Sequence, residues 1–219
     1  MQRSNLACTA NVDVLKQAER VCEARRVRRP RPLIVLALAA AVAGCGAGDT
    51  AARGLESPGQ RARLAAEEHA LARESPPRLA HVYAQRGQIL GGGLRAFRAR
   101  LAELRGYPVV VNKWASWCAP CRTELPFFRH QALARGRAIA FLGSNSEDTP
   151  NAARRFLGEI AIPYPSYEDR DSAIARFFEG AIAFPSTAIY DRHGRLATVK
   201  QGVYESERDL AADITRYAR

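Results

Sequence analysis

The stretch VVVNKWASWCAPCRTELP, residues 109–126, sets the fold expected for this chain. Its first residues, Val109 to Val111, begin a continuous apolar run that is typical of a buried central strand. Residues 119–135 predict a helix. A C-x-x-C pair, Cys118 and Cys121, therefore lies where a buried strand passes into a helix.

This position favours thiol chemistry. A thiol at a helix N-terminus faces free backbone N–H groups and the positive end of the helix dipole, and both stabilise the thiolate. The thiolate is the form that attacks a disulfide. The spacing places Cys121 one helical turn from Cys118, near enough to close a disulfide ring, and Pro120 is tolerated in a first helical turn.

A C-x-x-C pair has two other common uses, as half of a zinc site and as a purely structural disulfide. A zinc site needs a second pair of ligands. The chain has no second C-x-x-C, and its four histidines are scattered along the sequence. A C-x-x-C loop is also a poor structural staple because it is so short. We therefore expect neither a metal nor a cofactor at this pair.

Strands and helices alternate outward from this stretch. The patterns predict a hairpin from 78–83 and 88–90, further strands at 138–143, 186–190 and 196–202, and further helices at 94–105, 150–160, 172–178 and 207–217. This order predicts an α/β domain with a central mixed β-sheet flanked by helices, spanning residues 78–219.

The composition agrees with a globular domain. Apolar residues make up 47% of the 219 residues and charged residues 25%, which excludes a disordered chain, a collagen-like chain and a polytopic membrane protein. The formal net charge is +11, but the arginines are interspersed with acidic residues and no aromatic-basic stacking motif is present. We therefore expect no nucleic-acid partner.

The N-terminal part has the pattern of a targeting segment. A dense basic run at 25–31 precedes an apolar run at 33–44, which is shorter than the roughly 20 residues that a membrane-spanning helix needs. Small residues then lead directly to Cys45. This ending resembles the lipobox of bacterial lipoproteins, which implies cleavage before Cys45, a lipid on its sulfur and attachment to the outer face of the cytoplasmic membrane or another extracytoplasmic leaflet. An uncleaved anchor and a buried helix are the alternatives.

Four segments follow from these patterns. We expect residues 1–26 to be an upstream extension, with translation starting near Val27, and residues 27–45 to be the lipoprotein signal peptide. Residues 46–77 are rich in small residues, proline and charges, which predicts a flexible linker, with a weak helix possible over 60–74. The α/β domain follows.

The segment at 109–126 resembles the active-site segment of the TlpA/ResA-like branch of the thioredoxin superfamily. The resemblance rests on W-C-x-P-C, on Glu124 three residues after Cys121, on Pro126, and on the sequence FPST at residues 184–187, which resembles a cis-proline loop. Cytoplasmic thioredoxins have an aspartate on the preceding strand where this chain has Asn112, as this branch does. The stretch 143–164 is similar to the extra βα insertion of the branch.

The resemblance implies a thiol-disulfide oxidoreductase. Cys118 would be the nucleophile and Cys121 the resolving thiol, with Glu124, its pKa raised in an apolar site, exchanging protons with Cys121. Pro185 would complete the catalytic residues, and its exposed backbone would pair with a bound chain. Trp117, Phe184, Ser186 and Thr187 would bind substrate.

The resemblance also implies partners. They are protein thiols or disulfides such as those of apocytochrome c. Because the compartment outside the membrane is oxidising, a membrane electron donor would have to reduce the pair again. The lipobox pattern adds membrane lipid, bound through Cys45. Three alternatives stay open. The protein could work as a disulfide-forming oxidant on the same fold, as a peroxiredoxin, or as a copper-binding lipoprotein. The peroxiredoxin signature is absent, and copper carriers on this fold use a spacing one residue longer.

Overall fold

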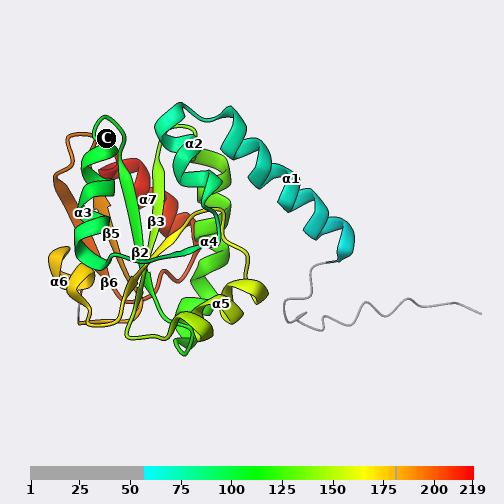
Figure 1. The fold of residues 1–219 in the computed structure, drawn as a ribbon. Coiled ribbons are helices and arrows are strands. Elements are labelled where there is room, and N and C mark those ends of the chain that lie inside the picture. Colours follow the sequence, from blue (N-terminus) through cyan, green and yellow to red (C-terminus); the bar gives the residue numbers. More distant parts are fainter. Residues whose placement is uncertain (1–56, 181) are drawn as a thin grey trace, which may run out of the picture. The chain divides into compact units, whose positions relative to one another are not determined.

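Six strands form a single sheet in the order β1-β4-β3-β2-β5-β6 (Figure 1). The strands are β1 (Ile89–Leu90), β2 (Val109–Trp114), β3 (Ala140–Ser146), β4 (Ser166–Asp169), β5 (Ser186–Tyr190) and β6 (Leu196–Gln201). The pairs β1–β4, β4–β3 and β3–β2 are parallel, whereas β5 runs antiparallel to both β2 and β6. The sheet is therefore mixed, as the sequence predicts.

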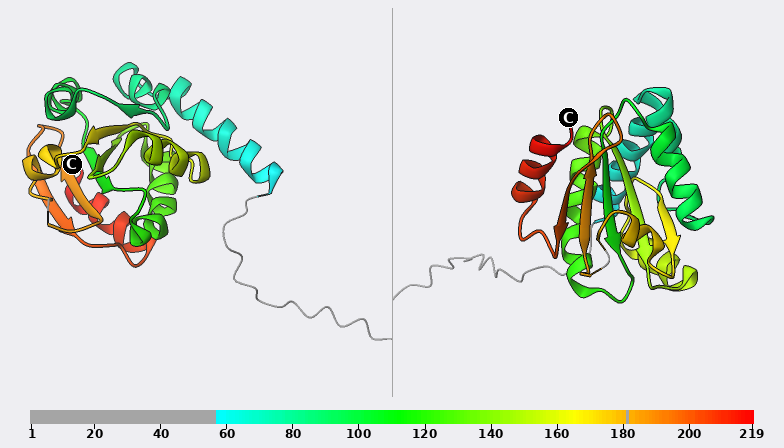
Figure 2. Two further views of the ribbon diagram at one scale, coloured as in Figure 1. Left: turned by 60° about the horizontal axis from the view of Figure 1, so that its bottom comes forward. Right: turned by 90° about the vertical axis from the view of Figure 1, so that its left-hand side faces the viewer.

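This computed structural model describes residues 57–180 and 182–219. The helices are α1 (Pro58–Glu74), α2 (Pro77–Ala84), α3 (Gly93–Glu103), α4 (Ala119–Arg135), α5 (Pro150–Glu159), α6 (Ala173–Phe177) and α7 (Glu207–Tyr217). Helices α4 and α7 pack together on one face, and α3 and α6 pack together on the other (Figure 2).

Strand β2 lies in the interior of the sheet, and this position accounts for the apolar residues from which the strand was predicted. All six of its residues are buried, and its neighbours β3 and β5 pair along both edges. Successive side chains of a strand point to opposite faces. Asn112 therefore faces α4, while Lys113 points to the α3–α6 face.

Two expectations for the start of the domain are wrong. Residues 77–84 form helix α2 rather than the first strand of a hairpin, because Leu79, Val82 and Tyr83 fall on one helical face and are all buried. Pro77 takes the first helical position, where its missing N–H costs no hydrogen bond. Strand β1 instead pairs in parallel with β4, a short strand that the sequence patterns missed.

Part of the segment expected to be a flexible linker is a helix, at the place where the sequence leaves a weak helix possible. Helix α1 begins with a capping box in which Ser57 and Gln60 bond each other's backbone N–H groups. Near its end, Leu71 is only 1% exposed and belongs to the core, and α1 contacts α2 and α4. This part of the segment is ordered because Leu71 is buried in the core. Residues 46–56, the signal segment at 27–45 with Cys45, and the extension at 1–26 lie outside the described residues.

The other elements agree closely with the sequence patterns. Helices α4 and α7 and strand β5 have the predicted bounds, and α3, α5, α6, β3 and β6 lie within a few residues of theirs. Pro126 lies inside α4, which continues through it from Ala119 to Arg135. The stretch 143–164 contains the end of β3 and the whole of α5.

Candidate active site

Cys118 and Cys121 form a disulfide where β2 passes into α4, with their Cα atoms 5.3 Å apart. Cys118 is the N-cap residue of α4, and the backbone N–H of Cys121 donates to the Cys118 Sγ at 3.1 Å. Cys118 keeps 3% of its surface exposed whereas Cys121 has none. An incoming reagent therefore reaches the sulfur of Cys118 first.

Glu124 lies one helical turn beyond Cys121 and is completely buried. Its Oε1 accepts a hydrogen bond from Asn112 Nδ2 at 2.7 Å, and its Oε2 accepts one from the backbone N–H of Tyr204 at 3.0 Å. Burial raises the pKa of Glu124 to about 7, against the lowering effect of these two hydrogen bonds and of the Lys200 charge. The carboxyl can therefore gain or lose a proton near neutral pH.

The bond between Phe184 and Pro185 is cis. The Phe184 ring packs against the Trp117 indole with 4.7 Å between ring centroids, and this contact joins the proline loop to the residue before Cys118. Trp117 is 57% exposed, and its Nε1 donates to the Glu147 carbonyl at 3.0 Å. The two loops that the sequence predicts to form one site thus touch each other.

The side chains of Ser186 and Thr187 are too deeply buried to contact a bound substrate. Both are buried in β5 and pair with Lys113 and Asn112 of β2. The Ser186 hydroxyl bonds the Ala183 carbonyl at 2.8 Å, whereas Thr187 Oγ1 has no partner among the described residues. Their side chains point into the protein, so the structure places only Trp117 and Phe184 of the predicted binding set at the surface.

Lys113 is a further residue of this region that the sequence patterns did not single out. It is completely buried, donates to the Ala183 carbonyl at 3.2 Å and lies 3.6 Å from the centroid of the Phe184 ring. Burial lowers the pKa of Lys113, while Glu147 and Asp169 act in the opposite direction. A lysine inside an apolar strand is the sequence signal that could have drawn attention to it.

An exposed apolar surface surrounds the site. Trp117 is 57% exposed and Ile182, in the proline loop, is 93% exposed. Phe184 of the same loop is partly exposed and packs on Trp117. Within residues 57–180 and 182–219, no cluster of three or more metal-ligating side chains is found. No helix in the same part of the chain is long and apolar enough to cross a membrane.

Comparisons with known proteins agree on one family. The family model described as Redoxin matches residues 98–214. The thiol:disulfide interchange protein HelX of Rhodobacter capsulatus is 45% identical over 64 residues, which is 29% of this chain and 35% of HelX. The thiol-disulfide oxidoreductase ResA of Bacillus subtilis is 26% identical over 78 residues, 35% of this chain and 44% of ResA. These matches span roughly a third to under half of the relatives' length.

Among solved structures, one match is a DsbF homologue from Corynebacterium diphtheriae. Its sequence is 31% identical, the match covers 53% of this chain and 75% of that chain, and the TM-score is 0.49.

Proposed function

Because the chain belongs to the Redoxin family and has a thioredoxin-like fold, we propose that it is a thiol-disulfide oxidoreductase acting through Cys118 and Cys121. The observation that carries the proposal is the disulfide at the N-terminus of α4, with the sulfur of Cys118 on its accessible side. The Redoxin match at residues 98–214 contains this pair, and two relatives are named as a thiol:disulfide interchange protein and a thiol-disulfide oxidoreductase.

The reaction balances without a cofactor. In the reduced protein the Cys118 thiolate attacks a substrate disulfide and releases one substrate thiolate, which takes up a proton. Cys121 then loses its proton and attacks the Cys118 Sγ of the mixed disulfide. This step releases the second substrate thiol and leaves the Cys118–Cys121 disulfide seen in the structure. Two electrons pass to the substrate, and the two protons come from Cys121 and from solvent.

Glu124 is the group placed to assist Cys121. It follows Cys121 by one turn of the same helix, and residues three apart on a helix are neighbours. A carboxyl with a pKa of about 7 can accept the proton of Cys121 as the thiol attacks and can return it in the reverse direction. Asn112 and the Tyr204 amide hold both carboxyl oxygens in place for this transfer.

The substrate is a protein segment that lies across Trp117 and the cis-proline loop. The exposed indole and the Phe184 ring offer apolar contact area next to Cys118. The backbone beside Pro185 offers hydrogen-bonding groups to an extended chain, as in strand addition. Ser186 and Thr187 act in this proposal through their position in β5, which fixes that loop.

We further propose the reductive direction, with apocytochrome c or another extracytoplasmic protein as substrate and a membrane protein as the electron donor. The compartment outside the membrane is oxidising, so a reductant there must be recharged. The lipobox pattern ending at Cys45 supports attachment to the outer face of the membrane through a lipid, with the domain beyond it.

Reduction of insulin by dithiothreitol, followed by turbidity, tests the activity. The full chain should accelerate the reaction, and Cys118→Ala should reduce it to the uncatalysed rate because no nucleophile remains. Arg208→Ala is the control, since it changes an exposed residue of α7 outside the cysteine pair and the proline loop, and it should retain full activity. Activity that survives in Cys118→Ala would contradict the proposal.

A further inference from the structure

A carboxylate from the loop after β3 holds the loop that precedes Cys118. The Asp148 Oδ2 accepts hydrogen bonds from the Ser116 backbone N–H at 2.6 Å and from Asn145 Nδ2 at 3.0 Å. Its Oδ1 accepts from the Ser116 hydroxyl at 2.9 Å and from the Thr149 backbone N–H at 2.7 Å. Both carboxylate oxygens are therefore used, and each of them holds Ser116.

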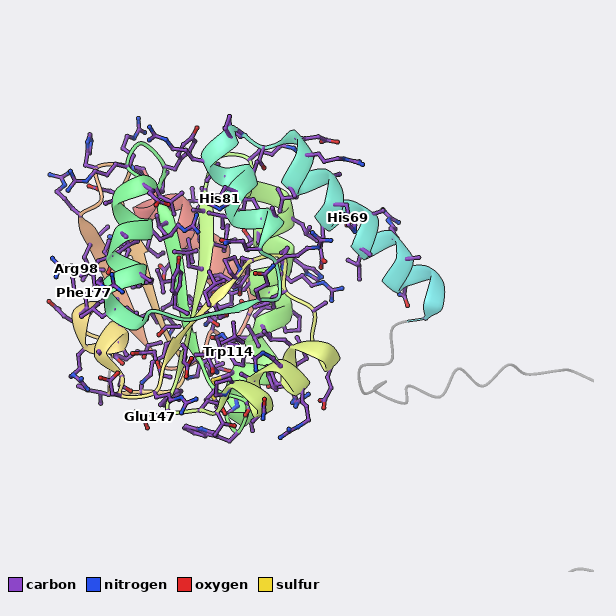
Figure 3. The ribbon with its side chains drawn as sticks, in the orientation of Figure 1. His69, His81, Arg98, Trp114, Glu147 and Phe177 are labelled. Carbon is purple, nitrogen blue, oxygen red and sulfur yellow. A yellow bond between two sulfur atoms is a disulfide. The ribbon has the colours of Figure 1, made fainter. Side chains whose placement is uncertain are left out.

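The neighbouring residue adds a second connection between the same two loops. The Glu147 carbonyl accepts the indole N–H of Trp117 at 3.0 Å, and Glu147 has the left-handed backbone conformation, with φ of 53°. Figure 3 labels Glu147 at the end of the molecule where β2 and β3 finish. Two consecutive residues of one loop thus bind two consecutive residues, Ser116 and Trp117, of the other.

The held residues form the turn that presents the nucleophile. The Cys118 backbone N–H donates to the Ala115 carbonyl at 3.1 Å, so Ser116 and Trp117 are the central residues of this turn. The turn delivers Cys118 to the N-cap position of α4, where its sulfur meets the Cys121 N–H. A thiolate at an N-cap is stabilised only while it stays aimed at these N–H groups.

We propose that Asp148 is a positioning residue for Cys118, fixing the turn at 115–118 so that the thiolate stays directed at the first turn of α4. This inference rests on the proposed function and deepens it. Asp148 is ionised when it does this: burial pushes its pKa up, but the hydrogen bonds from Asn145, Ser116 and Thr149 outweigh burial and hold the pKa below its usual value.

If Asp148 acts by positioning the turn, neutralising it should raise the pKa of Cys118. If it acts only through its negative charge, neutralising it should lower that pKa. A nearby negative charge disfavours a thiolate, so loss of that charge alone would lower the pKa of Cys118. Loss of the held turn would raise it, because the thiolate would lose part of its N–H stabilisation. The other charged groups around the two loops, Lys113, Glu147, Arg122 and Glu124, stay the same in the variant and cancel in the comparison.

The test is the rate at which iodoacetamide alkylates Cys118 in the reduced full chain, measured against pH by mass spectrometry of the peptide that contains it. In Asp148→Asn, only one oxygen remains to accept the bonds that two now accept. We expect the apparent pKa of Cys118 to rise, so that alkylation well below that pKa slows about three- to tenfold. Above the pKa, where both proteins are thiolates, the two rates should converge.

Asp191→Asn is the matched control. Asp191 also caps a turn, accepting the backbone N–H groups of His193 and Arg195 at 2.9 Å, but it lies beyond the opposite end of β5 from Pro185. Its Cys118 profile should match that of the unmodified protein. If Asp148→Asn does not fold, Ser116→Ala removes only the hydroxyl bond and should shift the profile in the same direction by less.

An unchanged or lowered pKa of Cys118 in a folded Asp148→Asn protein would overturn the inference. The failure of the proposed function looks different. In that case the unmodified protein itself would show an ordinary thiol pKa of about 8.5 at Cys118.

Discussion

Replacement of Glu124 by glutamine should change how the stability of the oxidised protein depends on pH. The glutamate is completely buried, and its pKa is raised from 4.5 to about 7, chiefly by burial. The folded protein therefore holds a proton that the unfolded chain releases between pH 4.5 and pH 7. Within that window unfolding becomes more favourable as pH rises, whereas below it both states are protonated.

The magnitude follows from the width of the window. Each pH unit is worth about 1.4 kcal/mol when the two states differ by one proton. Ionisation of Glu124 in the unfolded chain should therefore lower the free energy of unfolding by about 3 kcal/mol between pH 4.5 and pH 8. Glutamine cannot ionise, so Glu124→Gln escapes this loss, although it gives up one of the hydrogen bonds from Asn112 and Tyr204 at every pH.

Urea unfolding of the oxidised protein, followed by tryptophan fluorescence from pH 4.5 to pH 8, measures the effect. The difference in unfolding free energy between Glu124→Gln and the unmodified protein should move by about 3 kcal/mol in favour of the variant as pH rises. Glu159→Gln, which replaces an exposed glutamate of α5, is the matched control and should show no comparable change. A constant difference for Glu124→Gln across this range would refute the reasoning.

Three further predictions concern packing and substrate contact. Gly143→Ala should lower the free energy of unfolding by about 1–3 kcal/mol in urea denaturation, because a Cβ would press into Ser166 and lie 2.9 Å from Trp114 Nε1; an unchanged midpoint would contradict this. Leu71→Ala should cost about 2–5 kcal/mol by the same method, while half-buried Leu64 in the same helix tolerates alanine better; equal effects would mean that α1 is not part of the core. Ile182→Ala should raise KM for insulin but leave the rate with a small aromatic disulfide within about twofold, because Ile182 is 93% exposed and only a protein substrate uses the apolar surface; an equal loss with both substrates would argue against that surface.

The sequence predicts the central elements well because their local patterns are distinct. The helical pattern after Cys118 extends over 17 residues, whereas the short run Val109–Val111 indicates a strand through its β-branched residues. The pattern of the short segment at 78–83 is compatible with a strand and with a helix. The segment is helical in the structure because a helix buries both Leu79 and Tyr83. Strand β4 is polar and gains its partners only from β1 and β3, so no local pattern marks it.

The candidate site also contains residues that local motifs indicate and contacts that only the fold creates. The cysteines, Glu124 and Pro185 could be predicted because they lie in motifs that a single stretch of chain displays. The contact of Asp148 with Ser116 joins residues 32 positions apart, and nothing in either segment indicates the other. The inward direction of Ser186 and Thr187 likewise depends on how β5 pairs with β2. Contacts made across the fold are therefore the part that required the structure.

The reduction potential of the Cys118–Cys121 pair tests the central claim most directly. The full chain would be equilibrated in thiol–disulfide buffers of known potential, and the fraction oxidised measured after alkylation. We predict a reversible two-electron couple at or below the potential of thioredoxin, about −270 mV, as a reductant requires. A value near that of DsbA, about −120 mV, would contradict the reductive direction, and the absence of any reversible disulfide would contradict the oxidoreductase itself.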